Sequence, residues 1–262
     1  MNIFKEYTLA EYISEQGTNF GSSLPLVHST EGSNLLSILG NGVIETIPCD
    51  TFTDEKLSYF FHGRPSYRKF VNEPKFWQLP VVMVFKSTCL VNKTRIFPFD
   101  SGALYSNRLP KYISSFSPDG YQLSSKSDCL DLLIDIFFGD DASYFAGRAK
   151  PYDQVVGRRK FGVRHAQVAA LCSLYNREQL EADDRALAIE IQTDQDVQIK
   201  DNLIGAVLPR PYYDDPELKK YFRENRIIVK HYDIYPLSVE AYMSLIYSNV
   251  KELYMKWGLI GD

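Results

Sequence analysis

A group of polar side chains follows a short apolar run near the start of the chain. His28, Ser29 and Thr30 come directly after residues 25–27, so a strand over that run would end in a polar corner. An imidazole and two hydroxyls can each donate and accept hydrogen bonds, and Asn34 adds an amide to this set. The structural alternatives are a hydrogen-bonded histidine at a strand end and an Asn34 that caps a helix.

A helix is expected immediately after this corner. Leucine and isoleucine recur at helical spacing through residues 35–39. Ser33 or Asn34 is available as the N-cap, and Gly42 is placed to stop the helix. The result would be a strand–helix unit with its polar side chains at the junction.

Aromatic residues and one arginine gather in a second stretch. Tyr59 and Phe61 predict a strand that runs into a Gly-Arg-Pro turn carrying Arg64, and a helix with Tyr67 is expected to start near Ser66. Flat rings can stack on a planar ligand, and arginine can pair bidentately with phosphate or carboxylate. The structural alternatives are core aromatics and a solvated arginine.

Glu190 lies late in the chain, in the alternating segment of residues 186–192. Leu187, Ile189 and Ile191 would face the core, so Glu190 should point the other way. From the pattern alone, Glu190 is a solvated carboxylate on a strand.

The densest basic cluster precedes that segment and contains Arg158, Arg159, Lys160, Arg164 and His165. Aromatic residues are interleaved with it, namely Tyr152, Phe161 and Tyr175. Cations for phosphates and rings for unstacked bases are the components of a groove for single-stranded nucleic acid. An ordinary charged loop explains the cluster equally well.

Three of these segments resemble the motifs of ADP-ribosyltransferases, and of the DarT toxins in particular. The pattern H-x-T-x-x-x-N-L-x-x-I-L-x-x-G is met from His28 to Gly42. Tyr59-Phe-Phe-His-Gly-Arg64 is similar to the aromatic strand and turn that follow in the family, and Ala188-Ile-Glu190 is similar to its late strand. The motifs stand in the family's order and span most of the chain. After Arg64 the sequence departs from the DarT pattern, because it continues Pro-Ser-Tyr.

The resemblance implies a role for each side chain, with NAD as co-substrate. The residues that would hold NAD are His28, Ser29, Thr30, Asn34, Tyr59, Phe61, Arg64 and Tyr67. His28 would bond the adenosine-side ribose, and Tyr59 and Tyr67 would bracket nicotinamide, with Phe61 as a competitor for one of these places. Glu190, Arg64 and His28 are the catalytic candidates. Glu190 would stabilise the cationic ribose that forms as nicotinamide leaves.

The resemblance also implies a function. DarT-like enzymes attach ADP-ribose to nucleic acid and commonly act as toxins in toxin–antitoxin or anti-phage systems. DNA or RNA is therefore the expected acceptor, and a neutralising antitoxin is the expected partner. Two alternatives keep the fold: an NAD glycohydrolase, in which water attacks, and a protein-modifying transferase. A third alternative is a non-enzymatic binding module.

Composition limits the remaining classes. The 262 residues are 45% hydrophobic with a net charge of −4, which allows a buried core and argues against broad electrostatic capture of nucleic acid. The four cysteines are far apart and form no C-x-x-C pair, so buried free thiols and no metal site are expected. Signal-peptide, membrane-spanning, Rossmann and P-loop patterns are not found, which predicts a cytoplasmic protein without a membrane span.

The order of the elements predicts a single α+β domain over residues 1–262. The resemblance implies an ADP-ribosyltransferase-like domain with a central split antiparallel β-core flanked by helices and a C-terminal helix. Strands are expected at residues 25–27, 59–61, 79–85, 95–99, 185–193, 197–199, 203–208 and 227–235, and helices at 9–14, 35–41, 68–73, 127–138, 163–176, 215–226 and 238–257. Residues 43–53 should be irregular, and residues 100–124 and 140–160 should be long loops.

Overall fold

The computed structural model describes residues 7–49, 51–69, 71, 73–123, 128–156, 163–176, 184–236 and 238–261. Helices and strands are mixed along the chain, as the sequence predicts. Two compact units divide the chain: unit 1 contains Met1–Ser23 and Thr94–Ile191, and unit 2 contains Leu24–Lys93 and Gln192–Asp262. The chain thus passes twice through each unit, and a single domain over residues 1–262 stays a prediction.

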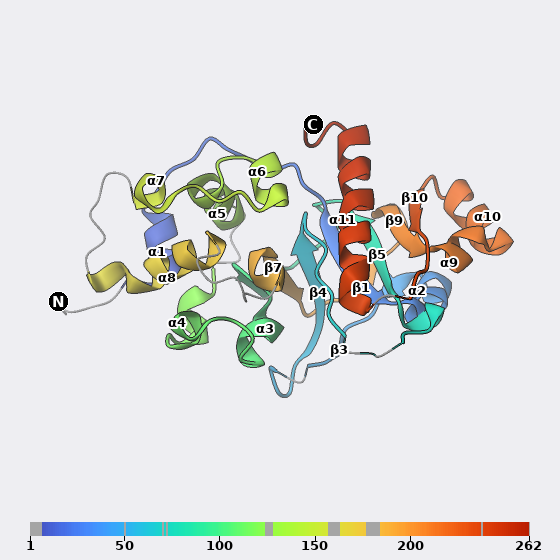
Figure 1. Ribbon diagram of the computed structural model, residues 1–262, viewed down its shortest axis with the longest axis horizontal. Coiled ribbons are helices and arrows are strands. Elements are labelled where there is room, and N and C mark those ends of the chain that lie inside the picture. The colour runs from blue at the N-terminus through green and yellow to red at the C-terminus, as the bar shows by residue number, and fades with distance from the viewer. Residues whose placement is uncertain are drawn as a thin grey trace. The chain divides into compact units, whose positions relative to one another are not determined.

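A mostly antiparallel sheet forms the centre of unit 2 (Figure 1). β10 and β9 pair in parallel, and the other pairings are antiparallel. β5 is buried along its whole length, which explains its unbroken apolar sequence. In sheet order the strands are β10 (Ile228–Tyr232), β9 (Leu203–Pro209), β5 (Pro80–Phe85), β1 (Leu26–Glu31) and β4 (Lys56–His62), with β3 (Ile47–Pro48) on β4. The short strands β2 (Val43–Ile44) and β8 (Val197–Gln198) pair separately.

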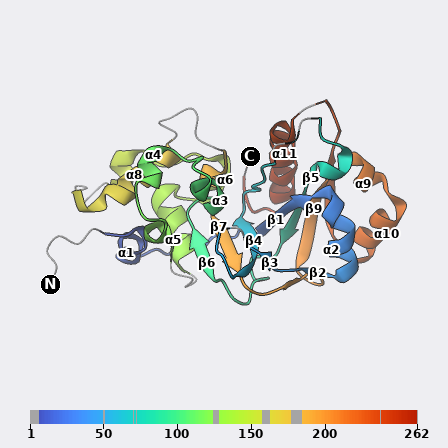
Figure 2. The same ribbon diagram turned by 90° about the horizontal axis from the view of Figure 1, so that it is seen from below.

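Helices pack on the sheet of unit 2. α11 (Val239–Lys256) contacts β10, β9 and β5, and Figure 2 shows it alongside β5 and β9. Gly205 of β9 allows Trp257, just after α11, to approach closely, because a Cβ at that position would lie 2.9 Å from the indole ring. α2 (Leu35–Asn41) follows β1 and ends at Gly42, whose φ of 71° favours glycine. None of the described helices combines the length and the apolar character needed to cross a bilayer.

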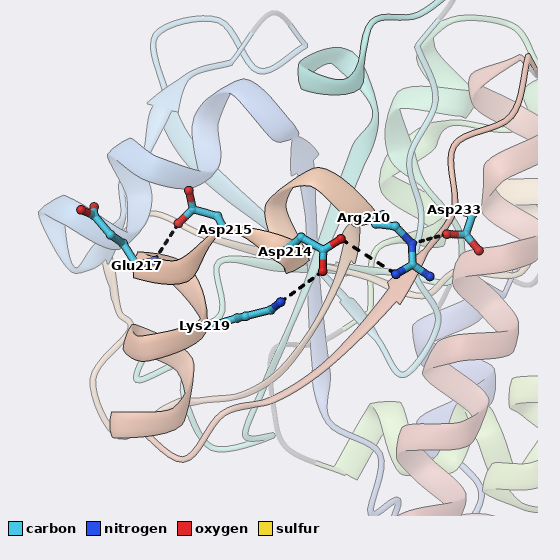
Figure 3. A network of polar contacts seen from close by, with 6 residues as sticks. All are labelled: Arg210, Asp214, Asp215, Glu217, Lys219 and Asp233. Atoms are coloured by element: carbon cyan, nitrogen blue, oxygen red, sulfur yellow. Dashed lines mark hydrogen bonds and ion pairs between the residues drawn. The ribbon is translucent and has the colours of Figure 1, made fainter.

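Two short helices, α9 (Arg210–Asp214) and α10 (Pro216–Glu224), carry an exposed network of charges (Figure 3). Arg210 pairs with Asp214 at 3.9 Å and with Asp233. Lys219 also pairs with Asp214, at 3.1 Å. Exposed ion pairs of this kind contribute little to stability. Asp215 instead fixes the start of α10, because its carboxylate accepts two backbone N–H groups of the first turn at 2.9 and 3.0 Å.

Unit 1 is built mainly from short helices around an aromatic core. The Tyr175 hydroxyl donates to the Pro98 carbonyl at 2.6 Å, and its ring meets the edge of Phe137. The helices are α1 (Leu9–Ser14), α3 (Ser101–Tyr105), α4 (Lys111–Ser114), α5 (Asp128–Phe137), α6 (Asp141–Ala146), α7 (Tyr152–Val156) and α8 (Ala166–Tyr175). The strands of this unit are β6 (Arg95–Phe97) and the beginning of β7 (Glu190–Thr193).

Several predicted elements are wrong. Residues 100–123 and 140–156 are not long loops, because they hold α3, α4, α6 and α7. These helices have four to six residues, too few to show a hydrophobic period. The predicted helix near Ser66 is not found among the described residues, where a 3₁₀ turn at Phe76–Gln78 is the next helical element. The strand predicted from residue 185 begins only at Glu190, after a 3₁₀ turn. Residues 43–48 carry β2 and β3, and α9 was not predicted.

The coarse fold prediction is confirmed. The chain is α+β, with a mostly antiparallel sheet, flanking helices and a long C-terminal helix. Its identity as an ADP-ribosyltransferase-like domain stays a prediction.

Candidate functional site

β1 and β4 separate partway along their length in unit 2. Among the described residues, β1 pairs with β4 at Leu26 and Val27, whereas its pairing with β5 continues to Glu31. The two strands therefore diverge from His28 onward. The His28 side chain crosses the divergence, since its Nδ1 atom lies 2.9 Å from the carbonyl oxygen of Tyr59.

A cavity of about 510 Å³ lies beside this divergence, within unit 2. Its volume falls in the range of roughly 300–1,000 Å³ that is usual for small-molecule sites. β1, β4, α2 and the segment after α2 supply the walls. Six of the eight residues predicted to hold NAD line this cavity, namely His28, Ser29, Thr30, Asn34, Tyr59 and Phe61.

His28 is held as a neutral imidazole in one tautomer. Burial lowers its pKa, and the hydrogen bond to Tyr59 opposes this effect only in part. A carbonyl oxygen can only accept, so Nδ1 must carry the proton that is shared with Tyr59. Nε2 is then a hydrogen-bond acceptor, which suits a ligand hydroxyl such as that of a ribose.

The Tyr59 ring is fixed at its far end. Tyr59 and Phe61 alternate with Phe60 along β4, so their rings belong to one side of the strand. The Tyr59 hydroxyl lies 2.7 Å from the Cys49 sulfur, which also accepts the backbone N–H of Phe52 at 3.1 Å. A flat ring held in this way can stack on a planar ligand group.

The polar residues at the start of α2 do not act as predicted. Asn34 occupies the N-cap position but makes no capping bond with its side chain. Its amide instead donates to the Thr30 hydroxyl at 2.9 Å, which ties α2 to the end of β1. The Ser29 hydroxyl is buried without a hydrogen-bond partner among the described residues, and Ser29 lines the cavity together with His28.

Ser37, Asn41 and Glu45 also line the cavity, and sequence reasoning missed them. The Asn41 amide donates to the Glu45 carboxylate at 3.1 Å. The Ser58 hydroxyl donates to the Glu45 carbonyl at 3.0 Å, which holds this segment against β4. A signal was present, because Asn34, Ser37 and Asn41 recur at three- and four-residue spacing and so share one face of α2.

The charge of the cavity wall is acidic. Glu45 is an exposed carboxylate, His28 is neutral, and no lysine or arginine is found among the described residues that line the cavity. A wall of this kind suits a neutral or cationic group better than a phosphate. The residues present therefore fit a nucleoside half of NAD, with nicotinamide as the cationic ring.

Arg64 lies in the same unit but is not a lining residue of the cavity. It is buried, with 5% of its surface exposed, and its guanidinium lies 5.2 Å from the centre of the Tyr247 ring. The turn that carries it is held by α11, because the hydroxyls of Tyr247 and Tyr254 each donate to turn carbonyls, those of Pro65 and Gly63, at 2.8 Å. The sequence alternative of a solvated arginine is wrong.

Tyr67 is outside the cavity wall as well, and it does not lie on a helix. Burial, followed by the charge of Glu31, raises the pKa of its hydroxyl to about 12. Lys69 forms an ion pair with Glu31 in the same region. Phe61, the predicted competitor, is the aromatic residue that lines the cavity with Tyr59.

Glu190 belongs to unit 1, and its side chain is 2% exposed. One carboxylate oxygen accepts the Ser101 backbone N–H at 3.0 Å, and the other accepts the Ser101 hydroxyl at 2.6 Å. The expectation of a solvated carboxylate is wrong, because β7 is buried at every position and so has no solvent face. The catalytic role of Glu190 stays a prediction.

The predicted nucleic-acid residues are described in part. Arg158, Arg159 and Lys160 lie outside the described residues. Arg164 is exposed, and the His165 ring is stacked on Tyr7 with centroids 4.9 Å apart.

The described residues contain no group of three or more His, Cys, Asp or Glu that could hold a metal ion. Comparisons with protein-family models, curated proteins and solved structures find no match for the chain.

Proposed function

We propose that the chain is an NAD-dependent ADP-ribosyltransferase, and that the cavity of unit 2 holds a nucleoside half of NAD. One observation carries the proposal: six residues chosen from the motif resemblance, spread from His28 to Phe61, line one cavity. Side chains that the motifs left unassigned complete a wall that suits a ribose and a cationic ring.

Each lining group has a task in this proposal. Tyr59 stacks on the nicotinamide ring, and Nε2 of His28 accepts a hydrogen bond from a ribose hydroxyl. The bond between the ribose C1″ and nicotinamide breaks, and nicotinamide leaves with the electron pair. The acceptor forms the new bond to C1″ and loses its proton. Glu190 is the proposed carboxylate that stabilises the cationic sugar.

The proposed acceptor is nucleic acid, and the proposed context is that of a toxin with a neutralising partner. Water as acceptor would make the protein an NAD glycohydrolase, and a protein side chain would make it a protein-modifying transferase. These alternatives share the NAD site and differ in the product, so one experiment separates them.

The test incubates purified protein with NAD labelled in the ADP-ribose part and with separate pools of single-stranded DNA, RNA and cell protein. We expect label in a nucleic-acid pool, released nicotinamide, and loss of both in Glu190→Gln. Nicotinamide release without a labelled pool would identify the hydrolase.

NAD binding is measured separately by calorimetry. Tyr59→Ala should weaken it about tenfold, because an aromatic contact is removed. The control is Tyr235→Ala, since Tyr235 is exposed and does not line the cavity. If Tyr59→Ala, Tyr235→Ala and the wild type bound NAD with equal affinity, the cavity would be rejected as the NAD site.

A further inference from the structure

Unit 2 contains a second recess, with a volume of about 420 Å³, where β5 ends and β9 and β10 begin. This volume is within the roughly 300–1,000 Å³ of small-molecule sites. The recess shares no lining residue with the large cavity. The sheet register separates the two, because His28 and Thr30 of the cavity pair with Met83 and Val81, whereas Lys86 of the recess follows the last residue of β5.

The buried part of the wall of this recess is apolar. Ile199, Leu203 and Ile227 are the buried lining residues, and the ring of Tyr221 lies half-buried among the others. Surfaces of this kind suit the organic body of a ligand, and a flat ring can stack on the tyrosine.

The exposed part of the wall is charged, and cations outnumber carboxylates. The cations are Lys86, Lys200 and Arg226, and the carboxylates are Asp201 and Glu224. Among the described residues, no ion pair involves any of these five side chains. The cations are therefore available to an anionic ligand, and the excess of positive charge attracts one. We call this site the basic recess.

Backbone hydrogen bonds hold the two turns that carry these charges. The Lys86 N–H donates to the Asn202 carbonyl at 2.9 Å, which joins the end of β5 to the turn before β9. The Ile227 N–H donates to the Phe222 carbonyl at 2.9 Å, which closes the C-terminal end of α10. The charged side chains thus project from fixed backbone, which lowers the cost of binding a ligand.

Arg226 occupies a backbone conformation that favours glycine. It follows α10 with a φ of 58°, in the left-handed region. α2 and α6 end at glycines in the same region, Gly42 and Gly147, with φ of 71° and 68°. An arginine there is strained, because its Cβ crowds the backbone. A side chain kept at a strained position is accounted for if it binds a ligand.

We propose that the basic recess binds a small organic phosphomonoester. The cations bind its phosphate, and the organic part lies against Tyr221 and the buried apolar side chains. The Arg226 guanidinium can donate two parallel hydrogen bonds to phosphate oxygens, and lysines act as point charges. The inference goes beyond the proposed function, because it assigns a second ligand site with no residue of the NAD cavity.

Calorimetry with the full-length protein at low salt compares phenyl phosphate, inorganic phosphate and benzylamine. We expect phenyl phosphate to bind about fivefold more tightly than inorganic phosphate, because the ring adds an aromatic contact. Benzylamine has the same ring with a positive charge and should not bind. Arg226→Gly should weaken phenyl phosphate about tenfold through loss of the guanidinium, and should raise the urea midpoint because glycine relieves the left-handed backbone. A purely structural arginine would not combine lost binding with gained stability.

Arg223→Gln is the matched control, since Arg223 is exposed on α10 and does not line the recess. It should keep the affinity for phenyl phosphate. Failure of phenyl phosphate to bind at millimolar concentration, equal affinity for inorganic phosphate or benzylamine, or unchanged affinity in Arg226→Gly would overturn the inference.

NAD binding is measured in parallel to separate this site from the proposed NAD cavity. Arg226→Gly should keep the affinity for NAD, and Tyr59→Ala should keep the affinity for phenyl phosphate. Loss of phenyl phosphate binding in Tyr59→Ala would place that probe in the NAD cavity and reject the basic recess. Phenyl phosphate binding at the recess without NAD binding would keep this inference and reject the proposed function.

Discussion

Glu45 is the acidic side chain in the wall of the large cavity, and its negative charge should attract a cationic ligand. NAD in its oxidised form carries a positive nicotinamide ring, whereas the reduced ring is neutral. Glu45→Gln should therefore weaken binding of the oxidised form about three- to fivefold and leave the reduced form unchanged. The effect is modest because Glu45 is exposed and screened by solvent.

Calorimetric titrations with both forms measure this difference. Glu217→Gln is the matched control, since Glu217 is an exposed carboxylate of the same unit outside the cavity. If Glu45→Gln left the ratio of the two affinities unchanged, the cavity would not hold the nicotinamide end.

His62 makes a second prediction at the residue scale, on stability rather than binding. Burial in β4, followed by the charge of Lys93, lowers its pKa to about 3. Between pH 6.5 and 3 the unfolded chain binds a proton at this site that the native protein does not bind. The contribution of neutral His62 to the free energy of unfolding is therefore fully present above pH 6.5, and it is lost as the pH falls from 6.5 towards 3.

Urea unfolding at pH 7 and pH 5 tests this sign. The wild type should lose about 2 kcal/mol more unfolding free energy than His62→Gln over this interval. A wild type that gains stability on acidification relative to His62→Gln would contradict the prediction.

At the scale of elements, the start of α10 depends on its cap more than on its ion pairs. Asp215→Ala removes an acceptor for two backbone N–H groups and should destabilise the protein by about 1 kcal/mol. Asp214→Ala removes two exposed ion pairs beside it and should cost well under half as much. Denaturant unfolding measures both losses, and the midpoints can be compared directly if the two variants unfold with the same slope. A larger loss of unfolding free energy in Asp214→Ala than in Asp215→Ala would show that the charge network dominates.

The elements that could be predicted are those with a long or strong pattern. The apolar run of β5, the amphipathic period of α11 and the glycine stop of α2 each gave elements within a few residues of the observed bounds. Short helices gave no such pattern. α3 and α6 begin at aspartates that cap them through backbone N–H groups, and a cap without a following period is also typical of a turn.

The candidate site shows the same limit. The motif residues of β1 and β4 could be found because each follows a local pattern. Glu45 could not be assigned in this way, since its place in the site depends on a contact with Asn41 that tertiary structure creates. The alternating pattern also does not predict the burial of Glu190, because both faces of β7 are covered.

For the molecule as a whole, charge differs between hollows of the two units. Among the residues that the structure describes, the cavity of unit 2 is lined by Glu45 and by no lysine or arginine, whereas Arg164 lines a smaller hollow of about 230 Å³ in unit 1. The net charge of the chain is −4, so long-range electrostatics do not favour a polyanion. Binding of nucleic acid must then come from a few local contacts, and this has a measurable consequence.

Oligonucleotide binding should weaken with salt, and NAD binding should respond much less. Each phosphate paired with a cation raises the dissociation constant about two- to threefold between 50 and 200 mM salt, because bound counterions are released from a single strand. Arg164→Gln should lower the slope of log Kd against log salt by about 0.7, the share of one contact. Arg148→Gln should keep the wild-type slope. Equal slopes for Arg164→Gln and the wild type would show that Arg164 makes no phosphate contact, and a steep slope for NAD would show that its phosphates meet cations outside the cavity wall.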